Sequence, residues 1–212
     1  MKKTIAIIVA AGSSSRMGEA GDKLFADLCG KPVLQYSIEA FKAAKSVDDI
    51  VVVCSAEAIE RVRGLCDSVT VVEGGRNRAE SVLCGINAVN YTEGIAAIHD
   101  GARPLITPEL IDTAVENYPC ILAIPVKDTV KQVKDGFIEA TPDRDSLYLA
   151  QTPQVFDLQT YRNARSCDVT DDSALMERMG VMVRIIQGDE RNIKITTPQD
   201  LEICRGLLNG AY

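Results

Sequence analysis

The sequence predicts an α/β fold: a three-layer, Rossmann-like, mostly parallel sheet with helices on both faces. Short apolar runs rich in β-branched residues, typical of strands buried on both faces, alternate with segments of helical periodicity. Polar clusters follow three of these runs, at residues 12–16, 74–78 and 100–103. Ligands of parallel sheets bind beyond the carboxyl ends of the strands, so these clusters should meet at one edge of the sheet.

The first apolar run, at residues 5–9, indicates a buried strand. Ala-Ala-Gly at residues 10–12 follows, small enough for the backbone to approach a ligand closely. Three serines, Arg16 and Lys23 come next. Hydroxyls and separated cations after a strand indicate a phosphate site, with a solvated surface loop as the alternative. The loop lacks both the Gly-Lys-Ser/Thr ending of kinase and ATPase loops and the GxGxxG of dinucleotide-binding folds, which argues against a dehydrogenase.

The remaining elements continue this alternation. Pro32 suits the first turn of a helix, and the apolar spacing of residues 33–44 extends it. Thr107 is expected to cap a helix that Pro108 begins, and residues 197–200 should open the final helix. Further strands are expected at residues 48–55, 68–72, 94–98, 121–125 and 181–187, further helices at 56–65, 77–89 and 168–180, and extended chain at 192–195.

Residues 126–150 interrupt the pattern. Apolar and polar side chains alternate around Lys-Asp-Gly at 134–136, which is a hairpin signal. The segment has too few apolar residues to join the main core, so we interpret it as a protruding β-arm on a single domain of residues 1–212. Such arms commonly serve oligomerisation, and an irregular insertion is the alternative.

Composition limits the classes of function. The net charge of −7 argues against nucleic acid as a partner, since that usually requires a basic surface. No apolar run approaches the roughly 18 residues of a membrane span. The opening residues resemble a secretory signal only briefly, so we favour a first core strand and a cytoplasmic protein. One histidine and seven cysteines without a CxxC pair make a structural zinc site improbable.

Eight segments, in order and at similar spacing, resemble the 2-C-methyl-D-erythritol 4-phosphate cytidylyltransferase family of the non-mevalonate isoprenoid pathway. They are AAGSSSRM, GGRNRAESV, HDGARP, PVKDTVK, ATPDR, AQTPQ, TDDSALME and NIKITTPQDL. The resemblance covers nearly the full chain. It implies a homodimeric, Mg²⁺-dependent nucleotidyltransferase that acts on CTP and a polyol phosphate.

The resemblance also implies the roles of single residues. The catalytic side chains would be Arg16, Lys23, Lys194 and Arg144. Nucleotide contacts would come from Ala10, Ala11, Gly12, Ser13, Gly75, Arg78, Ser81 and Asp100, with Asp100 also beside the metal. Polyol phosphate contacts would come from Arg103, Thr129, Arg144, Thr152 and Thr170. Arg76 departs from the family, where some members carry an acidic residue beside the base, which puts that contact in doubt.

The implied chemistry fits these residue types. A phosphate monoester with a second pKa of about 6 is already a nucleophile near neutrality, so no general base is required. Arg and Lys clamps with Mg²⁺ then stabilise the crowded anions. Each assignment has a structural alternative: Asp100 as a turn cap, His99 as a buried structural histidine, Arg144 in an ion pair with Asp143, and Thr170 as an N-cap. A charge at Lys194, between apolar neighbours, indicates a function.

Two other functions remain open on the sequence alone. Ribitol phosphate in place of methylerythritol phosphate keeps the reaction and changes the acceptor. A nucleotide-binding regulator without catalysis would require a missing cation, yet Arg16, Lys23 and Lys194 are all present.

Overall fold

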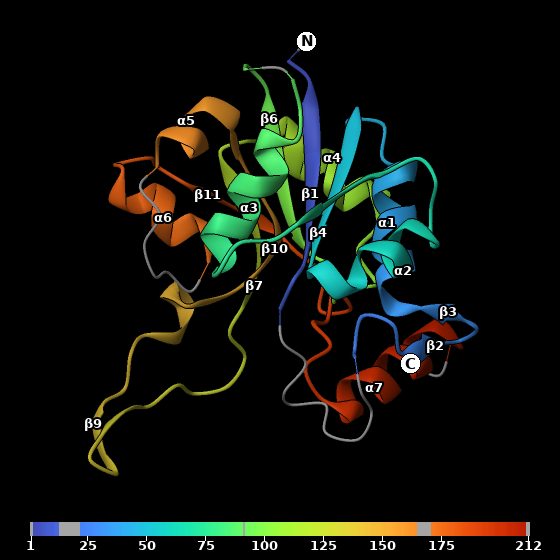
Figure 1. Ribbon diagram of the computed structural model, residues 1–212. Helices are drawn as coiled ribbons and strands as arrows, with labels where there is room; N and C mark the ends of the chain where they lie inside the picture. Colours follow the sequence, from blue (N-terminus) through green and yellow to red (C-terminus); the bar gives the residue numbers. More distant parts are fainter. Residues whose placement is uncertain (1, 13–21, 91, 165–170, 211–212) are drawn as a thin grey trace.

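The computed structural model describes residues 2–12, 22–90, 92–164 and 171–210 (Figure 1). A seven-stranded sheet, in the order β11-β7-β10-β6-β1-β4-β5, forms its centre. The strands are β1 (Thr4–Ala10), β4 (Asp49–Cys54), β5 (Thr70–Glu73), β6 (Ile95–Asp100), β7 (Cys120–Pro125), β10 (Tyr148–Asp157) and β11 (Arg184–Gln187). Within this sheet only β10 runs antiparallel to its neighbours, which confirms the mostly parallel α/β fold.

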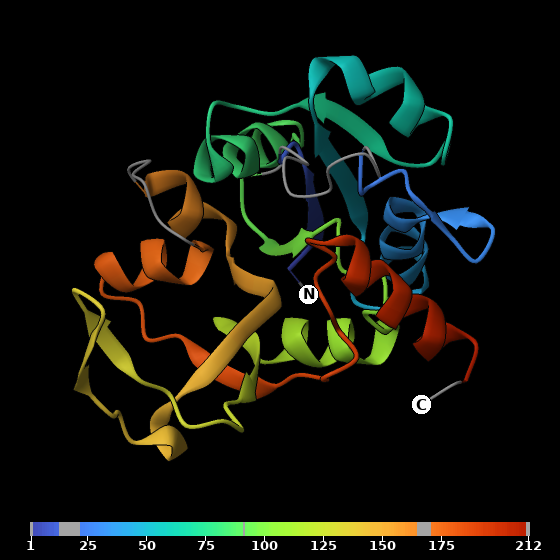
Figure 2. The ribbon, with the colours of Figure 1, turned by 90° about the horizontal axis from the view of Figure 1, so that it is seen from below.

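Helices cover both faces of the sheet, as the continuous apolar strands require (Figure 2). In β1, Ile8 faces one layer and Ile7 the other. The first layer contains α1 (Val33–Ala43), α2 (Ile59–Arg63) and α4 (Pro108–Glu116). The second layer contains α3 (Arg78–Asn87), α5 (Leu158–Asn163) and α6 (Asp172–Arg178). Successive side chains of a strand thus enter two separate cores.

Side-chain caps fix the starts of several helices. Thr107 accepts a hydrogen bond from the Leu110 N–H with Pro108 in the first turn, as predicted. Thr197 and Asp200 form a capping box at the start of α7 (Pro198–Leu208). The helix expected at residues 168–180 begins at Asp172, with Asp171 as its cap. The segment expected as one helix at 56–65 is a 3₁₀ turn, η2 (Ala56–Ala58), followed by the short α2.

Strand β10 corrects the sequence prediction. The predicted arm ended at residue 150, but β10 begins at Tyr148 and then passes between β7 and β6 in the middle of the sheet. Its buried half contains Gln151, Thr152 and Gln154, so it lacks the apolar run that marks the other strands. Hydrogen bonds to distant residues satisfy these polar groups, and a sequence pattern does not show them. Helix α5, directly after β10, was also not predicted; it has only 6 residues.

The predicted hairpin is present. Strands β8 (Gln132–Lys134) and β9 (Phe137–Ala140) pair antiparallel, and all their residues are exposed. Asp135 and Gly136 join them with φ of 49° and 84°, the left-handed conformation that such turns require. The arm projects from the body of the molecule, and η3 (Arg144–Ser146) lies on its return path (Figure 1).

A third small core lies beyond the carboxyl edge of the sheet. Helix α7 packs there on the hairpin of β2 (Asp27–Leu28) and β3 (Lys31–Pro32), through Leu28, Ile195 and Cys204. The chain at residues 192–195, predicted to be extended, forms no strand in the described sheets, and the Ile195 N–H donates to the Ala102 carbonyl. Among the described residues, no helix combines the length and apolar character needed to cross a bilayer.

Candidate active site

Asp100, the last residue of β6, is the centre of a cluster of cations at the carboxyl edge of the sheet. Its Oδ1 lies 2.5 Å from Arg78 Nη1, and its Oδ2 lies 2.9 Å from Lys194 Nζ and 3.4 Å from Arg103 Nε. Arg78 is the first residue of α3, Arg103 lies in the turn after β6, and Lys194 precedes α7. Three separate segments therefore bring positive charge to one carboxylate. Two of them are the polar clusters at residues 74–78 and 100–103, which the sequence predicted to meet at this edge.

The charge of Asp100 is strongly stabilised. Its burial acts to raise the pKa of the carboxyl, but Arg78, Lys194 and Arg103 outweigh burial and hold that pKa well below its usual range. Burial likewise acts to lower the pKa of Arg78, and the carboxylates of Asp172 and Asp100 more than reverse the effect. Both partners are thus ionised at neutral pH. The cluster is a preassembled set of charges within reach of solvent, since 40% of the Lys194 side chain is exposed.

Two cavities share Arg78, Asp100 and Lys194 in their walls. The first, of about 80 Å³, is completed by the loop after β1 and its neighbours: Val9, Ala10, Gly12, Lys23, Leu24 and Ala102. The second, of about 250 Å³, is completed by the middle of β10 and by polar residues around it: Arg103, Ala150, Gln151, Thr152, Gln154 and Asp171. Four of the residues predicted to contact nucleotide, Ala10, Gly12, Arg78 and Asp100, thus line the first cavity. Two of those predicted to contact acceptor, Arg103 and Thr152, line the second.

The loop after β5 lies against the loop after β1. A Cβ atom on Gly74 would come within 2.8 Å of the Ala11 Cβ, so only glycine permits this approach. The Gly75 N–H donates to Ser81 Oγ at 3.1 Å, and Ser81 Oγ donates to the Asn77 carbonyl at 2.8 Å. Arg76 points elsewhere and pairs with Glu80 at 2.7 Å. The predicted nucleotide residues Gly75, Ser81 and Ala11 therefore belong to one compact loop region.

Asp100, Thr152 and His99 form a chain of hydrogen bonds behind the cluster. The Asp100 N–H donates to Thr152 Oγ1 at 3.0 Å, and Thr152 Oγ1 lies 3.0 Å from His99 Nδ1. Nε2 lies 3.2 Å from the Arg103 carbonyl, which can only accept, so Nε2 carries the proton of the neutral ring. Nδ1 then accepts from the Thr152 hydroxyl. His99 is fully buried, and burial lowers its pKa to about 3, so the ring is neutral. The expectation of a structural histidine is confirmed.

Other predicted residues lie outside this cluster. Thr129 and Arg144 are exposed on the arm, and Arg144 Nη1 donates to the Lys127 carbonyl at 3.0 Å. Asp143 accepts from the Asp145 N–H, and the described contacts do not pair it with Arg144. Ser13, Arg16 and Thr170 lie outside the described residues. The cap of α6 is Asp171, so the alternative assignment of Thr170 as the cap is wrong.

Sequence reasoning missed one member of the cluster. Asp172 binds the other edge of the Arg78 guanidinium, at 2.8 Å from Nη2. Two consecutive aspartates stand in TDDSALME, and the first of them caps α6. The second, Asp172, does not cap the helix. A second acidic residue without a capping role was the signal in the sequence that it binds something else.

The residues present fit a magnesium ion. No three His, Cys, Asp or Glu side chains gather as a metal site in the described part of the chain. Magnesium does not need such a group, because it keeps several waters and takes one or two carboxylates plus substrate phosphate oxygens. A carboxylate oxygen has two lone pairs, and Arg78 uses one on Oδ1 of Asp100. Asp100 is therefore suited to be a single protein carboxylate for Mg²⁺.

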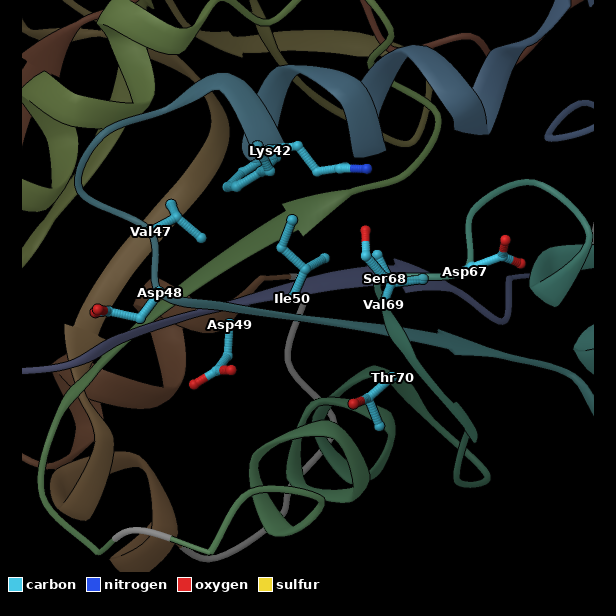
Figure 3. A pocket seen from close by; sticks show the side chains of 10 residues that line it. Lys42, Val47, Asp48, Asp49, Ile50, Asp67, Ser68, Val69 and Thr70 are labelled. Carbon is cyan, nitrogen blue, oxygen red and sulfur yellow. The ribbon is translucent and has the colours of Figure 1, made fainter.

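A larger cavity, of about 390 Å³, lies at the opposite edge, where β4 and β5 begin (Figure 3). Asp48, Asp49 and Asp67 line it together with Lys42. Carboxylates outnumber cations on this wall, so it would repel a triphosphate. The carboxyl edge, with its excess of Arg and Lys, is the edge that suits anionic substrates.

An enzyme that joins two phosphorylated compounds must hold two anions against each other. Two adjoining cavities with cations in their common wall meet this requirement, and on this sheet they define a nucleotidyltransferase. The profile of the 2-C-methyl-D-erythritol 4-phosphate cytidylyltransferase family matches residues 4–209. The chain belongs to this family.

Individual relatives agree along the whole length. The cytidylyltransferase of this name from Geobacter metallireducens is 41% identical over 224 residues, covering 96% of each chain. That from Caldanaerobacter subterraneus subsp. tengcongensis is 43% identical, covering 94% of this chain and 96% of the relative. The crystal structure of 4-diphosphocytidyl-2C-methyl-D-erythritol synthase from Anaerococcus prevotii superposes with a TM-score of 0.83 at 31% identity, covering 98% of this chain and 99% of that one.

Proposed function

We propose that the protein transfers CMP from CTP to 2-C-methyl-D-erythritol 4-phosphate, giving CDP-methylerythritol and pyrophosphate for isoprenoid precursor synthesis. Membership of the family carries the identity of the substrates. The observation that supports the reaction type is that Arg78, Asp100 and Lys194 line both of two adjoining cavities. One cavity adjoins the small-residue loop suited to a triphosphate, and the other adjoins Arg103 and Thr152.

In this reaction a phosphate oxygen of the acceptor attacks the α-phosphorus of CTP. A new P–O bond forms, the bond between the α-phosphorus and its bridging oxygen breaks, and pyrophosphate carries away the electron pair. The acceptor phosphate is largely ionised near neutrality, so the site needs no base. This agrees with a lone histidine that is buried and neutral. Catalysis then depends on positioning two anions and stabilising charge.

We assign that stabilisation to Lys194, Lys23 and Arg16. Residues 10–13, together with Gly75, Arg78 and Ser81, are proposed to hold CTP. Lys194 reaches solvent from the wall that both cavities share, and Lys23 lines the first cavity. Asp100 would hold Mg²⁺, which supplies positive charge to the triphosphate oxygens when bound. Arg103, Thr129, Arg144, Thr152 and Thr170 are proposed to recognise the acceptor, and a bidentate Arg suits its phosphate.

We further propose a homodimer formed through the arm. Val133, Phe137 and Ile138 are 58%, 79% and 65% exposed on β8 and β9. Exposed apolar side chains on one projecting hairpin mark a surface that another chain covers. Sedimentation should show a dimer that Phe137→Lys weakens, while Met182→Lys, at a residue 91% exposed elsewhere, leaves it intact. A wild-type monomer at working concentration would remove this proposal.

We place the enzyme in the cytoplasm, without a membrane or nucleic-acid partner. The cysteines of the described residues are all free thiols, as is usual in a reducing compartment. The net charge of −7 disfavours a polyanionic partner.

Turnover with the two polyol phosphates tests the proposed function. The purified protein is incubated with CTP, Mg²⁺ and either methylerythritol phosphate or ribitol 5-phosphate, and pyrophosphate release is followed. We expect release with the first acceptor to be the faster. Faster release with ribitol 5-phosphate would change the acceptor, and binding of CTP without release in either case would favour a regulator.

A further inference from the structure

Asp172 is a buried carboxylate that the reaction as described does not use. It is the first residue of α6 and is 1% exposed. Its Oδ2 accepts from Arg78 Nε at 3.0 Å and from Arg78 Nη2 at 2.8 Å. Its Oδ1 accepts from the hydroxyl of Tyr161, in α5, at 2.6 Å. One carboxylate thus joins a helix of the second layer to the cation that faces the substrates.

The position of this carboxylate is fixed from several sides. Gln154, in the central strand β10, donates from Nε2 to Asp171 Oδ2 at 2.9 Å and accepts the Ser173 N–H at 2.9 Å. The Asp171 side chain caps the same helix through the Ala174 N–H. The start of α6 is therefore tied to the middle of the sheet on both sides of Asp172.

Fold stability alone does not account for a charge in this place. Removing a carboxylate from water is expensive, and an ion pair in the interior is often no more stable than apolar residues of the same volume. Burial raises the pKa of the Asp172 carboxyl even against the opposing effects of Arg78 and Tyr161. The protein thus keeps a costly group, and what that group contacts on the side of the site is Arg78.

The contacts of Arg78 show what the group achieves. A guanidinium has five N–H donors in one plane. Asp172 takes the Nε donor and one from Nη2, and Asp100 takes one from Nη1. Two donors remain, one on each terminal nitrogen, for hydrogen bonds to a ligand. With Asp100 alone, the plane could rotate about a single contact.

We propose that Asp172 is a positioning residue that fixes the plane of the Arg78 guanidinium, so that its two remaining donors meet bound CTP. The inference rests on the proposed function. Arg78 lines the cavity beside Ala10 and Gly12, where the nucleotide is placed, and its side chain is 22% exposed. Asp172 itself is buried behind Arg78 and acts on the substrate only through it.

Asp172→Asn tests the proposal, because the amide keeps an oxygen acceptor for Arg78 and loses the charge. We expect kcat/KM for CTP to fall about 10- to 100-fold, as when other residues that orient a ligand-binding group are changed. The KM for the polyol phosphate should change less than about twofold. Tyr161→Phe is the matched control, since it removes the hydrogen bond to the other oxygen of Asp172 and leaves both contacts with Arg78; its kcat/KM should fall less than about threefold.

A double-mutant cycle separates positioning from a structural role. If Asp172 acts through Arg78, Asp172→Asn should have no further effect on kcat/KM in an Arg78→Met background. A loss that persists in that background, or an equal loss in Tyr161→Phe, would overturn the proposal. Thermal unfolding of each variant shows whether activity merely follows stability.

The Nε–H signal of Arg78 gives a readout that does not depend on turnover. In ¹⁵N-labelled protein this proton should be protected from exchange with water, because its acceptor is buried. Protection should be lost in Asp172→Ala, which removes the acceptor, and kept in Tyr161→Phe; protection in neither or in both contradicts the proposal. If the wild type releases no pyrophosphate from CTP, the proposed function fails while this measurement still decides the role of Asp172.

Discussion

The carboxyl edge of the sheet and the β-arm use charged residues in opposite ways. At the edge, Arg78, Arg103 and Lys194 converge on one buried carboxylate whose pKa they depress. On the arm, Arg144 is exposed and donates to a backbone carbonyl. The packed elements of the fold fix the positions of the charged side chains at the edge, whereas few contacts hold Arg144 on the arm. We therefore expect changes in the body to alter folding or the chemical step, and changes in the arm to alter acceptor recognition.

The largest contrast should be in stability. Phe156 in β10 is fully buried in the second core, and Phe156→Ala should lower the free energy of unfolding by about 3–5 kcal/mol. Phe137 on the arm is 79% exposed, and Phe137→Ala should cost less than about 0.5 kcal/mol at protein concentrations below dimerisation. Urea unfolding measures both. Similar costs would show that the arm belongs to the cooperative core.

Lys194→Ala should lower kcat about 100- to 1,000-fold, because it removes a cation that we propose stabilises the developing charge. Lys131→Ala on the arm provides the matched control, since Lys131 contacts only a threonine hydroxyl among its described hydrogen bonds. Its kcat should stay within about twofold of the wild type. Steady-state pyrophosphate release measures both variants, and an unchanged kcat in Lys194→Ala would contradict the role proposed for that lysine.

The body should also lose stability in mild acid through His99. Folded His99 takes up a proton only near pH 3, whereas the unfolded chain does so near the ordinary value of 6.5. Between these values the unfolded state binds the extra proton, so the free energy of unfolding falls as pH falls, by up to about 1.4 kcal/mol per pH unit. His99→Gln should reduce that slope between about pH 5 and 6. An identical slope in both proteins would show that His99 titrates normally.

Arg144→Ala should have the smallest effect of the four. We expect the KM for the polyol phosphate to rise about tenfold, the value of one charge-assisted hydrogen bond, with the melting temperature unchanged. Arg144→Lys should recover part of that affinity, since it keeps the charge and loses the bidentate geometry. A rise in the KM for CTP instead would assign Arg144 to the nucleotide.

Local signals in the sequence predicted much of the fold. Thr107 caps a helix as expected, residues 197–200 begin the final helix as expected, and Asp-Gly at residues 135–136 forms the expected hairpin turn. The sequence predicted that Arg78 and Asp100 lie close together, because each belongs to a polar cluster that follows a strand. Lys194 was added to the same site by the family resemblance. The roles of these residues remain predictions.

What the sequence did not predict depends on contacts between distant residues. Strand β10 is central, yet Gln151 and Gln154 break its apolar pattern, and their partners lie 38 and 17 residues away. Asp172 was missed because its partner, Arg78, is 94 residues earlier in the chain. Burying a polar group is tolerated only when it has a hydrogen-bond partner, and the local pattern of apolar residues does not show where a distant partner lies.

Strand β10 carries the base of the arm and the floor of the site on one continuous backbone. Side chains of a strand alternate between faces, so one inserted residue turns all later side chains over. The pairing of β10 with β7 is irregular between Ala150 and Gln154, so an insertion just after Gln154 is the one that would move Val155 and Phe156 into each other's cores. An insertion at Asp135–Gly136 would only lengthen the arm. The arm can therefore change in length without disturbing the fold, whereas β10 cannot.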